Sequence, residues 1–204
     1  MLSDIEVHYR GRLPHWEKDE SCYFVTFRLA DSLPSDILES IKFEKRSLLR
    51  TADQLNRELS SDEKSRLARL SKMRIEECLD SGAGACHLAK PEVAEIVANA
   101  LRYFDDQRYR LFAWCVMPNH VHVLFQLFPY VALASVLHSW KSFTSKKINN
   151  ALGVHGELWE REYYDHLVRN DGDFARVVRY ILQNPTKARL RDWPWVWVVP
   201  EIKP

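Results

Sequence analysis

The sequence predicts an α+β fold in which helices pack on an antiparallel sheet. Residues 22–29 (CYFVTFRL) are aromatic and β-branched with partial alternation, which indicates a buried strand. Residues 110–117 and 120–128 form two further strands, and Pro118 and Asn119 between them supply the chemistry of a tight turn. The order strand, long helical region, hairpin, helix, strand, helix is typical of a ferredoxin-like antiparallel sheet with packed helices.

The helical region between the first strand and the hairpin is charged and Leu-rich. Its residues 36–80 hold ten basic and ten acidic side chains, which predicts a pair of helices with solvated faces. Ser60 and Glu63 fit a capping box for the second helix, and Gly82 stands where that helix would end. We therefore expect one domain over residues 1–204, with a charged helical insertion at about 36–90.

The remaining elements follow from periodicity and capping residues. After Pro91, apolar residues recur at helical spacing up to Phe104, so this helix has a stripe that must face the sheet. Residues 131–149 predict another helix, and residues 157–168 an aromatic strand. Asp171 and Asp173 then open a last helix that Pro185 is expected to limit.

Composition excludes several classes of protein. A net charge of +1, from 29 Lys+Arg and 28 Asp+Glu, gives no global case for a nucleic-acid partner. The four cysteines form no CxxC pattern and the first residues lack the apolar run of a secretion signal, so we expect a reduced, cytoplasmic protein. No apolar stretch approaches the roughly 20 residues that cross a bilayer, so no membrane span is expected.

His120 and His122 are the most informative pair in the sequence. Side chains alternate along a strand, so both imidazoles point to one face, roughly 6.5 Å apart at Cα, while Val121, Val123, Phe125 and Leu127 point to the other. At this separation they can share one divalent cation. Taken alone, the pattern also fits two histidines that are simply packed or solvated.

The last helix strengthens the case for a site. With about 100° per residue, Tyr180 lies to one side of the apolar stripe and Asn184 lies directly above it, one turn further on. The phenol can serve as a nucleophile and the amide oxygen as a third, hard ligand. Two neutral imidazoles and an amide oxygen leave positions for water and phosphate, which favours a catalytic Mg²⁺ or Mn²⁺ over a closed zinc site.

Three separated blocks stand out in the sequence: WCVMPNHVHVLF from residue 114, WEREYYDH from residue 159 and VVRYILQNPTKA from residue 177. Together they resemble the single-tyrosine HUH transposases, and most closely the REP-associated tyrosine transposases. RGRLPHW from residue 10 and YFVTFRL from residue 23 are also similar to members of that group. The similarity covers most of the chain and is weakest over residues 36–90.

The resemblance implies an HUH endonuclease-type core that cleaves and rejoins single-stranded DNA beside hairpin, REP-like sequences. It implies that His120 and His122 are metal ligands, that Tyr180 forms a 5′-phosphotyrosine, and that Asn184 is the third ligand. Many relatives carry Gln at that place, but Gln183 is about 100° round the helix and is the poorer candidate. The resemblance is compatible with a monomer or with a homodimer in which one subunit's tyrosine helix completes the other's site.

Local charge supports a DNA partner where the total does not. Residues 135–191 hold ten Lys+Arg and six Asp+Glu. A basic rim would hold phosphates, and aromatic groups would stack on unpaired bases. The expected DNA-binding residues are Arg10, Arg12, Trp16, Lys141, Lys146, Lys147, Trp159 and Arg161.

Two alternatives stay open for the function, and one for the nucleophile. The chain could be a domesticated module that binds DNA hairpins without cleaving them, or a hydrolase with a histidine metal site that forms no protein-linked intermediate. Some HUH nucleases use two tyrosines, which draws attention to Tyr163 and Tyr164. Adjacent residues of a strand face opposite ways, however, so Tyr180 is preferred.

Overall fold

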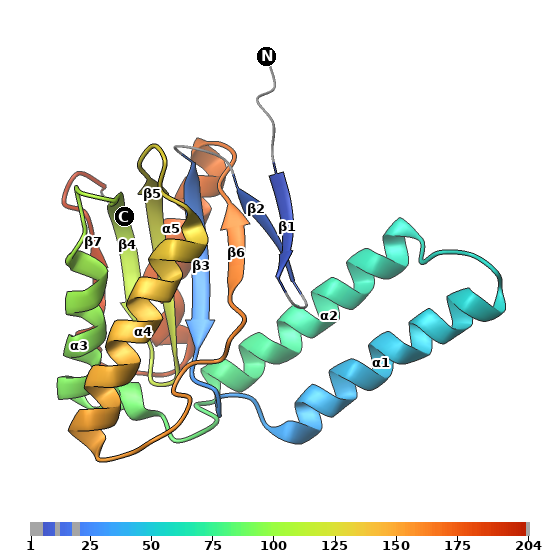
Figure 1. Cartoon of the computed structure of the whole chain (residues 1–204), viewed down its shortest axis with the longest axis horizontal. Helices are drawn as coiled ribbons and strands as arrows, with labels where there is room; N and C mark the ends of the chain where they lie inside the picture. Colours follow the sequence, from blue (N-terminus) through green and yellow to red (C-terminus); the bar gives the residue numbers. More distant parts are fainter. Residues whose placement is uncertain (1–5, 11–12, 18–20, 203–204) are drawn as a thin grey trace.

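The centre of the molecule is a five-stranded antiparallel sheet. The computed structural model describes residues 6–10, 13–17 and 21–202. The sheet strands are β3 (Cys22–Arg28), β4 (Tyr109–Val116), β5 (His120–Leu127), β6 (Tyr164–Leu167) and β7 (Val196–Val198). Their order is β6-β3-β5-β4-β7, with β5 at the centre between β3 and β4 (Figure 1). Strands β6, β3, β5 and β4 lie side by side in the order of a ferredoxin-like sheet, so the predicted fold class is confirmed.

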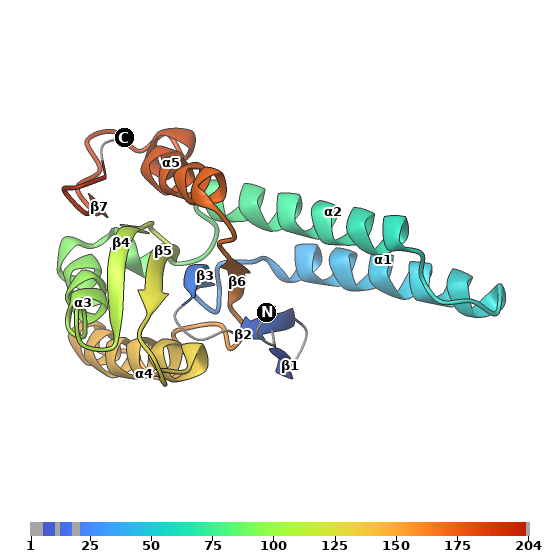
Figure 2. The same cartoon turned by 90° about the horizontal axis from the view of Figure 1, so that it is seen from above.

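Helices cover both faces of this sheet. On one face, α3 (Pro91–Arg102) and α4 (Leu133–Leu152) bury the larger hydrophobic core, which includes Val25, Phe27 and Trp140. On the other face lies α5 (Asp171–Lys187), whose Val177, Val178 and Ile181 pack on a smaller cluster. Figure 2 shows the sheet from above, between α5 and the α3–α4 pair.

Strand register decides which side chains share the α5 face. In the pairing of β3 with β5, Thr26 stands opposite His122 and Arg28 stands opposite His120. Side chains directly opposite each other in an antiparallel pair lie on the same face. Both histidines therefore point toward α5, and the valines that alternate with them point into the larger core.

The charged helical region is a hairpin of two long helices, α1 (Ser35–Gln54) and α2 (Ser61–Asp80), which projects from the sheet (Figures 1 and 2). The capping box of α2 is confirmed: the Glu63 amide donates to the Ser60 hydroxyl at 3.2 Å, and the Ser60 amide donates to the Glu63 carboxylate at 2.9 Å. A short 3-10 helix, η1 (His87–Ala89), then leads into α3.

Three features differ from the sequence prediction. Strand β6 occupies only the end of the segment 157–168, and Pro185 lies inside α5, which continues to Lys187 because proline removes only one donor so close to the helix end. Strands β1 (Glu6–Arg10), β2 (Leu13–Glu17) and β7 were not predicted.

Within residues 6–10, 13–17 and 21–202, none of the helices combines the length and apolar character that crossing a bilayer requires.

Candidate active site

Two neighbours orient the histidine pair on β5. The His120 Nδ1 lies 2.7 Å from the Asn119 Oδ1, and the His122 Nδ1 lies 2.7 Å from the Thr26 Oγ1. The Asn119 amide nitrogen donates to the Ala83 carbonyl at 2.9 Å, which leaves its oxygen to accept from His120. Asn119 thus assigns Nδ1 of His120 as the donor, and the Thr26 hydroxyl can accept from the His122 Nδ1; in that tautomer the lone pair of each imidazole lies on Nε2.

The two Nε2 atoms face each other at 3.0 Å. Burial and the neighbouring His122 hold the pKa of His120 well below its usual range, so its imidazole is neutral and can serve as a metal ligand. Adjacent ligands of an octahedral cation, each about 2.1 Å from it, are about 3.0 Å apart. The histidine pair therefore fits a shared divalent cation.

Helix α5 brings Tyr180 against this pair within one chain. The apolar stripe of α5 docks on the sheet, and Tyr180 follows on its flank, half-buried. The Tyr180 ring centroid lies 5.2 Å from that of His122 and 5.6 Å from that of Phe24, both edge to face. The Lys187 Nζ lies 4.8 Å from the centroid of the same ring. The phenol is thus held on three sides beside the histidines.

The phenol is not activated by its surroundings alone. Burial raises the pKa of Tyr180 well above its ordinary value, and the carboxylates Glu76 and Asp80 raise it further. A hydrogen bond with the Asn184 side chain opposes this rise in the pKa. These surroundings therefore favour the neutral, protonated phenol.

Asn184 is buried, at 1% exposure, one turn after Tyr180 on α5. Its Nδ2 donates to the Tyr180 carbonyl at 3.2 Å, so the amide group is fixed relative to the helix that carries the tyrosine. The other amide atom, Oδ1, remains as the oxygen donor of the predicted ligand set. His120, His122, Tyr180 and Asn184 are thus supplied by β5 and by the helix packed on its histidine face.

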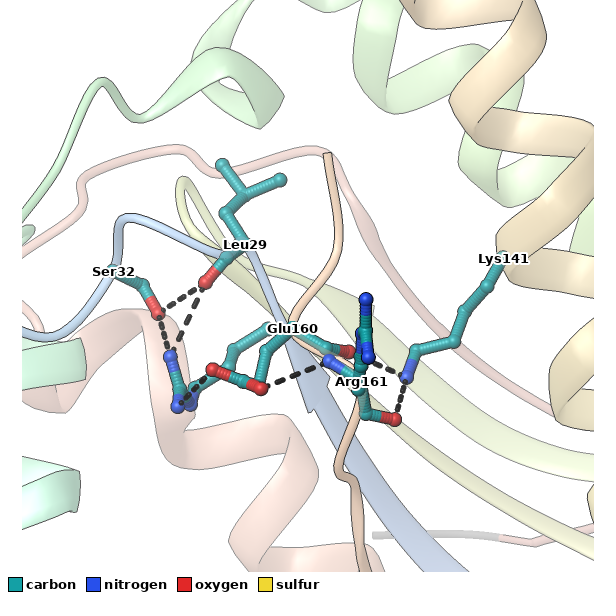
Figure 3. A network of polar contacts seen from close by, with 6 residues as sticks. Leu29, Ser32, Lys141, Glu160 and Arg161 are labelled. Atoms are coloured by element: carbon teal, nitrogen blue, oxygen red, sulfur yellow. Dashed lines mark hydrogen bonds and ion pairs between the residues drawn. The ribbon is translucent and has the colours of Figure 1, made fainter. Parts of the chain in front are cut away.

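A polar network next to His120 joins three segments of the chain (Figure 3). Arg28 donates to the Glu160 carboxylate at 2.9 Å, to the Ser32 hydroxyl at 3.2 Å and to the Leu29 carbonyl at 3.4 Å. Lys141 of α4 donates to the carbonyls of Glu160 and Arg161 at 2.7 and 2.9 Å. The network fixes the segment before β6 and keeps a guanidinium on the histidine face.

The predicted DNA-binding residues have different surroundings. Trp159 is only 5% exposed, packs edge to face on Phe27 at 4.9 Å and donates to the Thr144 hydroxyl at 2.8 Å. The prediction that it stacks on bases is wrong, because its indole is part of the core. Lys141 is occupied by two carbonyls, so its ammonium is not an open phosphate contact.

The other predicted contacts stay predictions. Lys146 and Lys147 are exposed on α4, and Arg161 is exposed and pairs with Glu157 at 2.8 Å. The lysines lie on the helix that covers the opposite face of the sheet from the histidines. Arg12 lies outside the described residues, as do the side chains of Arg10 and Trp16, whose backbone belongs to β1 and β2.

The adjacent tyrosines face opposite ways, as expected for a strand. Tyr164 pairs with Thr26 in register and its ring lies 6.4 Å from Phe24 on the histidine face. Tyr163 packs against the larger core, where the Lys141 Nζ lies 5.6 Å from its ring centroid. His166 is engaged by Asp173 at 2.8 Å, at the beginning of α5.

Sequence reasoning missed Thr26, Asn119 and Glu76. Asn119 was seen only as a turn residue and Thr26 only as part of a strand. The strand register opposite the histidines is a signal that could have identified Thr26. No local pattern connects Glu76 with Tyr180, because the two are 104 residues apart.

Comparison with known proteins points the same way as the geometry. Residues 87–184 match the family described as "Transposase IS200 like". REP-associated tyrosine transposases of Haemophilus influenzae and Escherichia coli (strain K12) are each 28% identical to this chain, over 97 and 94 residues. These matches cover 41% and 44% of this chain and 55% and 54% of the relatives, so the chain spans about half the length of the curated relatives it matches.

The fold has a solved counterpart. The structure of a REP-associated tyrosine transposase bound to a REP hairpin matches with a TM-score of 0.50 at 18% identity, over 93% of this chain and 81% of that one. At this identity the likeness concerns the fold alone. The chain is therefore similar to the IS200-like transposases over residues 87–184, and to the REP-associated tyrosine transposases over the regions matched by the two curated relatives.

Proposed function

We propose that the chain is a metal-dependent DNA strand transferase, which cleaves and rejoins single-stranded DNA beside a hairpin through a 5′-phosphotyrosine. The observation that carries this proposal is the approach of Tyr180 to the histidine pair inside one chain, with the His122 and Tyr180 ring centroids 5.2 Å apart. The named relatives are transposases, and the solved counterpart was bound to a REP hairpin.

In this proposal His120, His122 and the Asn184 oxygen hold Mg²⁺ or Mn²⁺. The bound cation would polarise the scissile phosphate and offset the charge that develops on it. The fit rests on the facing Nε2 atoms, 3.0 Å apart, each fixed by a partner on its Nδ1. Asn119 and Thr26 keep both imidazoles in the tautomer that a metal requires.

Tyr180 supplies the nucleophile. Its oxygen loses the phenolic proton and attacks the phosphorus, a bond forms between the tyrosine and the 5′-phosphate, and the bond to the 3′ oxygen breaks as that oxygen takes up a proton, so no proton is gained or lost overall. The phosphodiester's energy is kept in the protein–DNA bond, so attack by a 3′-hydroxyl can later reverse the step and join strands. We further propose that residues 1–204 act as one domain, with α1 and α2 as its helical insertion.

Covalent trapping tests this function. Wild-type protein and Tyr180→Phe are incubated with a pool of stem-loop oligonucleotides that carry single-stranded flanks, with Mn²⁺ or with EDTA. We expect a protein–DNA adduct that survives denaturing electrophoresis for the wild type with Mn²⁺, and none for Tyr180→Phe. An adduct of undiminished yield in the variant would overturn the assignment of the nucleophile.

The same experiment distinguishes the two alternative functions. Hairpin binding by the wild type without adduct across the whole pool would indicate a non-cleaving DNA-binding module. Cleaved DNA with no protein-linked species would indicate a hydrolase. Phenylalanine keeps the ring that packs on Phe24 and His122, so loss of the adduct in Tyr180→Phe reports the missing hydroxyl rather than a lost contact.

A further inference from the structure

The helical insertion reaches the hydroxyl of Tyr180. The Tyr180 Oη donates to the Glu76 Oε1 of α2 at 3.3 Å. Glu76 lies in the last turns of α2, whose carboxyl end comes beside α5 in Figure 2. A segment that the sequence presents as a peripheral, solvated hairpin therefore contacts the atom that we propose attacks DNA.

Charge complementarity supports this contact between α2 and α5. Asp80 follows Glu76 by one helical turn and so lies on the same side of α2. Lys187 of α5 lies over the Tyr180 ring; burial and the neighbouring Glu76 raise the pKa of Asp80, and the charge of Lys187 opposes that rise. The carboxylates of α2 thus face a lysine and a phenol of α5, which holds the insertion against the tyrosine.

Glu76 and Asn184 both hydrogen-bond with Tyr180, and Glu76 is the one that accepts from its hydroxyl. Phe24, His122 and Lys187 lie against the ring and limit where it can move. Glu76 accepts from the hydroxyl itself and so sets the direction of the O–H bond. Because that bond points at α2, the lone pairs of the oxygen are turned away from α2, and a lone pair is what attacks phosphorus.

We propose that Glu76 is a positioning residue for Tyr180, so that the helical insertion contributes a residue to the active site. This inference rests on the proposed function, since it concerns the same tyrosine. Misplacement of a reacting atom by about 1 Å can cost on the order of a hundredfold in rate. Removing the acceptor should therefore slow adduct formation without weakening the binding of DNA.

The test compares Glu76→Ala, Glu76→Gln and the matched control Glu77→Ala, whose carboxylate is on the adjacent, exposed position of α2. We expect Glu76→Ala to form adduct at least about tenfold more slowly than wild type, with the same Kd for the hairpin pool. Glutamine retains an oxygen acceptor, so Glu76→Gln should restore the rate to within about threefold. Glu77→Ala should match the wild type.

A second measurement needs no DNA and separates failure of this inference from failure of the proposed function. 3-Fluorotyrosine is placed at position 180, and its ¹⁹F shift is recorded in each background. The shift should move in Glu76→Ala and stay in Glu76→Gln and Glu77→Ala, with the melting temperature as a control for folding.

A wild-type adduct together with an unchanged rate in Glu76→Ala would overturn the positioning role. An unmoved ¹⁹F shift in Glu76→Ala would overturn it as well. Equal slowing in Glu76→Gln and Glu76→Ala would overturn it too. No wild-type adduct, with a moved shift, would instead count against the function alone.

Discussion

Each histidine of the pair is held by a neighbour that the His-x-His motif does not contain. Thr26 is brought to His122 by the pairing of β3 with β5, and Asn119 reaches His120 from the turn before β5. Such partners fix the ring orientation and the tautomer of a metal-binding imidazole. The affinity of the site for a cation should therefore depend on side chains that do not bind it.

Thr26→Val tests this dependence. Valine keeps the shape of threonine but offers no acceptor at the His122 Nδ1, which the wild type holds at 2.7 Å. We expect the affinity for Mn²⁺ to fall by about 10- to 100-fold, measured by calorimetric titration without DNA. Thr51→Val, on the exposed side of α1, is the matched control and should bind Mn²⁺ like the wild type. Equal affinities in Thr26→Val and wild type would contradict the role of Thr26.

Residue chemistry alone did not distinguish aromatic core from aromatic surface. Trp159 and Trp16 carry the same side chain and both were expected to contact DNA. The structure buries Trp159 against Phe27 because the Leu29–Trp159 bridge draws the segment before β6 onto the sheet. That bridge is a long-range contact, and no local pattern around residue 159 predicts it.

At the scale of elements, the sequence predicted the parts with strong periodicity or capping. The hairpin β4–β5, the helices α3, α4 and α5 and the capping box of α2 were all foreseen. The short strand β7 was not, because three residues carry too little pattern, and its place beside β4 depends on tertiary contacts. The flank of α5 that carries Tyr180 and Asn184 was foreseen because helical geometry fixes it.

Lys141 ties α4 to the segment before β6, and this link predicts a dependence of stability on pH. Burial lowers the pKa of Lys141 to about 8, although Glu160 and Glu162 favour the charged form. In the unfolded chain the pKa of lysine is about 10.4. Between these two values the unfolded chain binds the extra proton, so the free energy of unfolding should rise with pH through this group.

The measurement is urea unfolding of wild type and Lys141→Met at several pH values. The stability of wild type relative to the variant should be constant between pH 6 and 7 and should increase from about pH 8 to pH 10. The neutral amine can still donate to the Glu160 and Arg161 carbonyls, which lie at 2.7 and 2.9 Å, so the link survives deprotonation. A relative stability that falls over this range would show that the folded state favours the charged amine.

At the scale of the whole molecule, charge is divided between surfaces. The α1–α2 region carries ten basic and ten acidic residues over positions 36–80, whereas positions 135–191 carry ten basic and six acidic. The near-neutral total therefore combines a neutral segment, a segment with four more basic than acidic residues, and the rest of the chain, which holds nine basic and twelve acidic residues. The acidic side chains are not all remote from the site, because Glu76 of the neutral region contacts Tyr180. The cation and Lys187 would offset this negative charge when a phosphate enters.

The arrangement of the site within one chain predicts the outcome of mixing two inactive variants. Tyr180→Phe lacks the nucleophile, and His122→Gln lacks a metal ligand in our proposal. In a dimer that exchanges tyrosine helices, a mixed pair contains one complete site. Here Tyr180 lies beside the His122 of its own chain, at 5.2 Å between ring centroids, so each variant chain carries a defective site. The mixture should form no more adduct than the two variants alone.

Two controls accompany this mixing experiment. Wild type mixed with each variant, at the same total protein, should form adduct in proportion to its share, and circular dichroism should show that both variants fold. Adduct in the variant mixture at a substantial fraction of the wild-type yield would mean that α5 completes a site in a second chain.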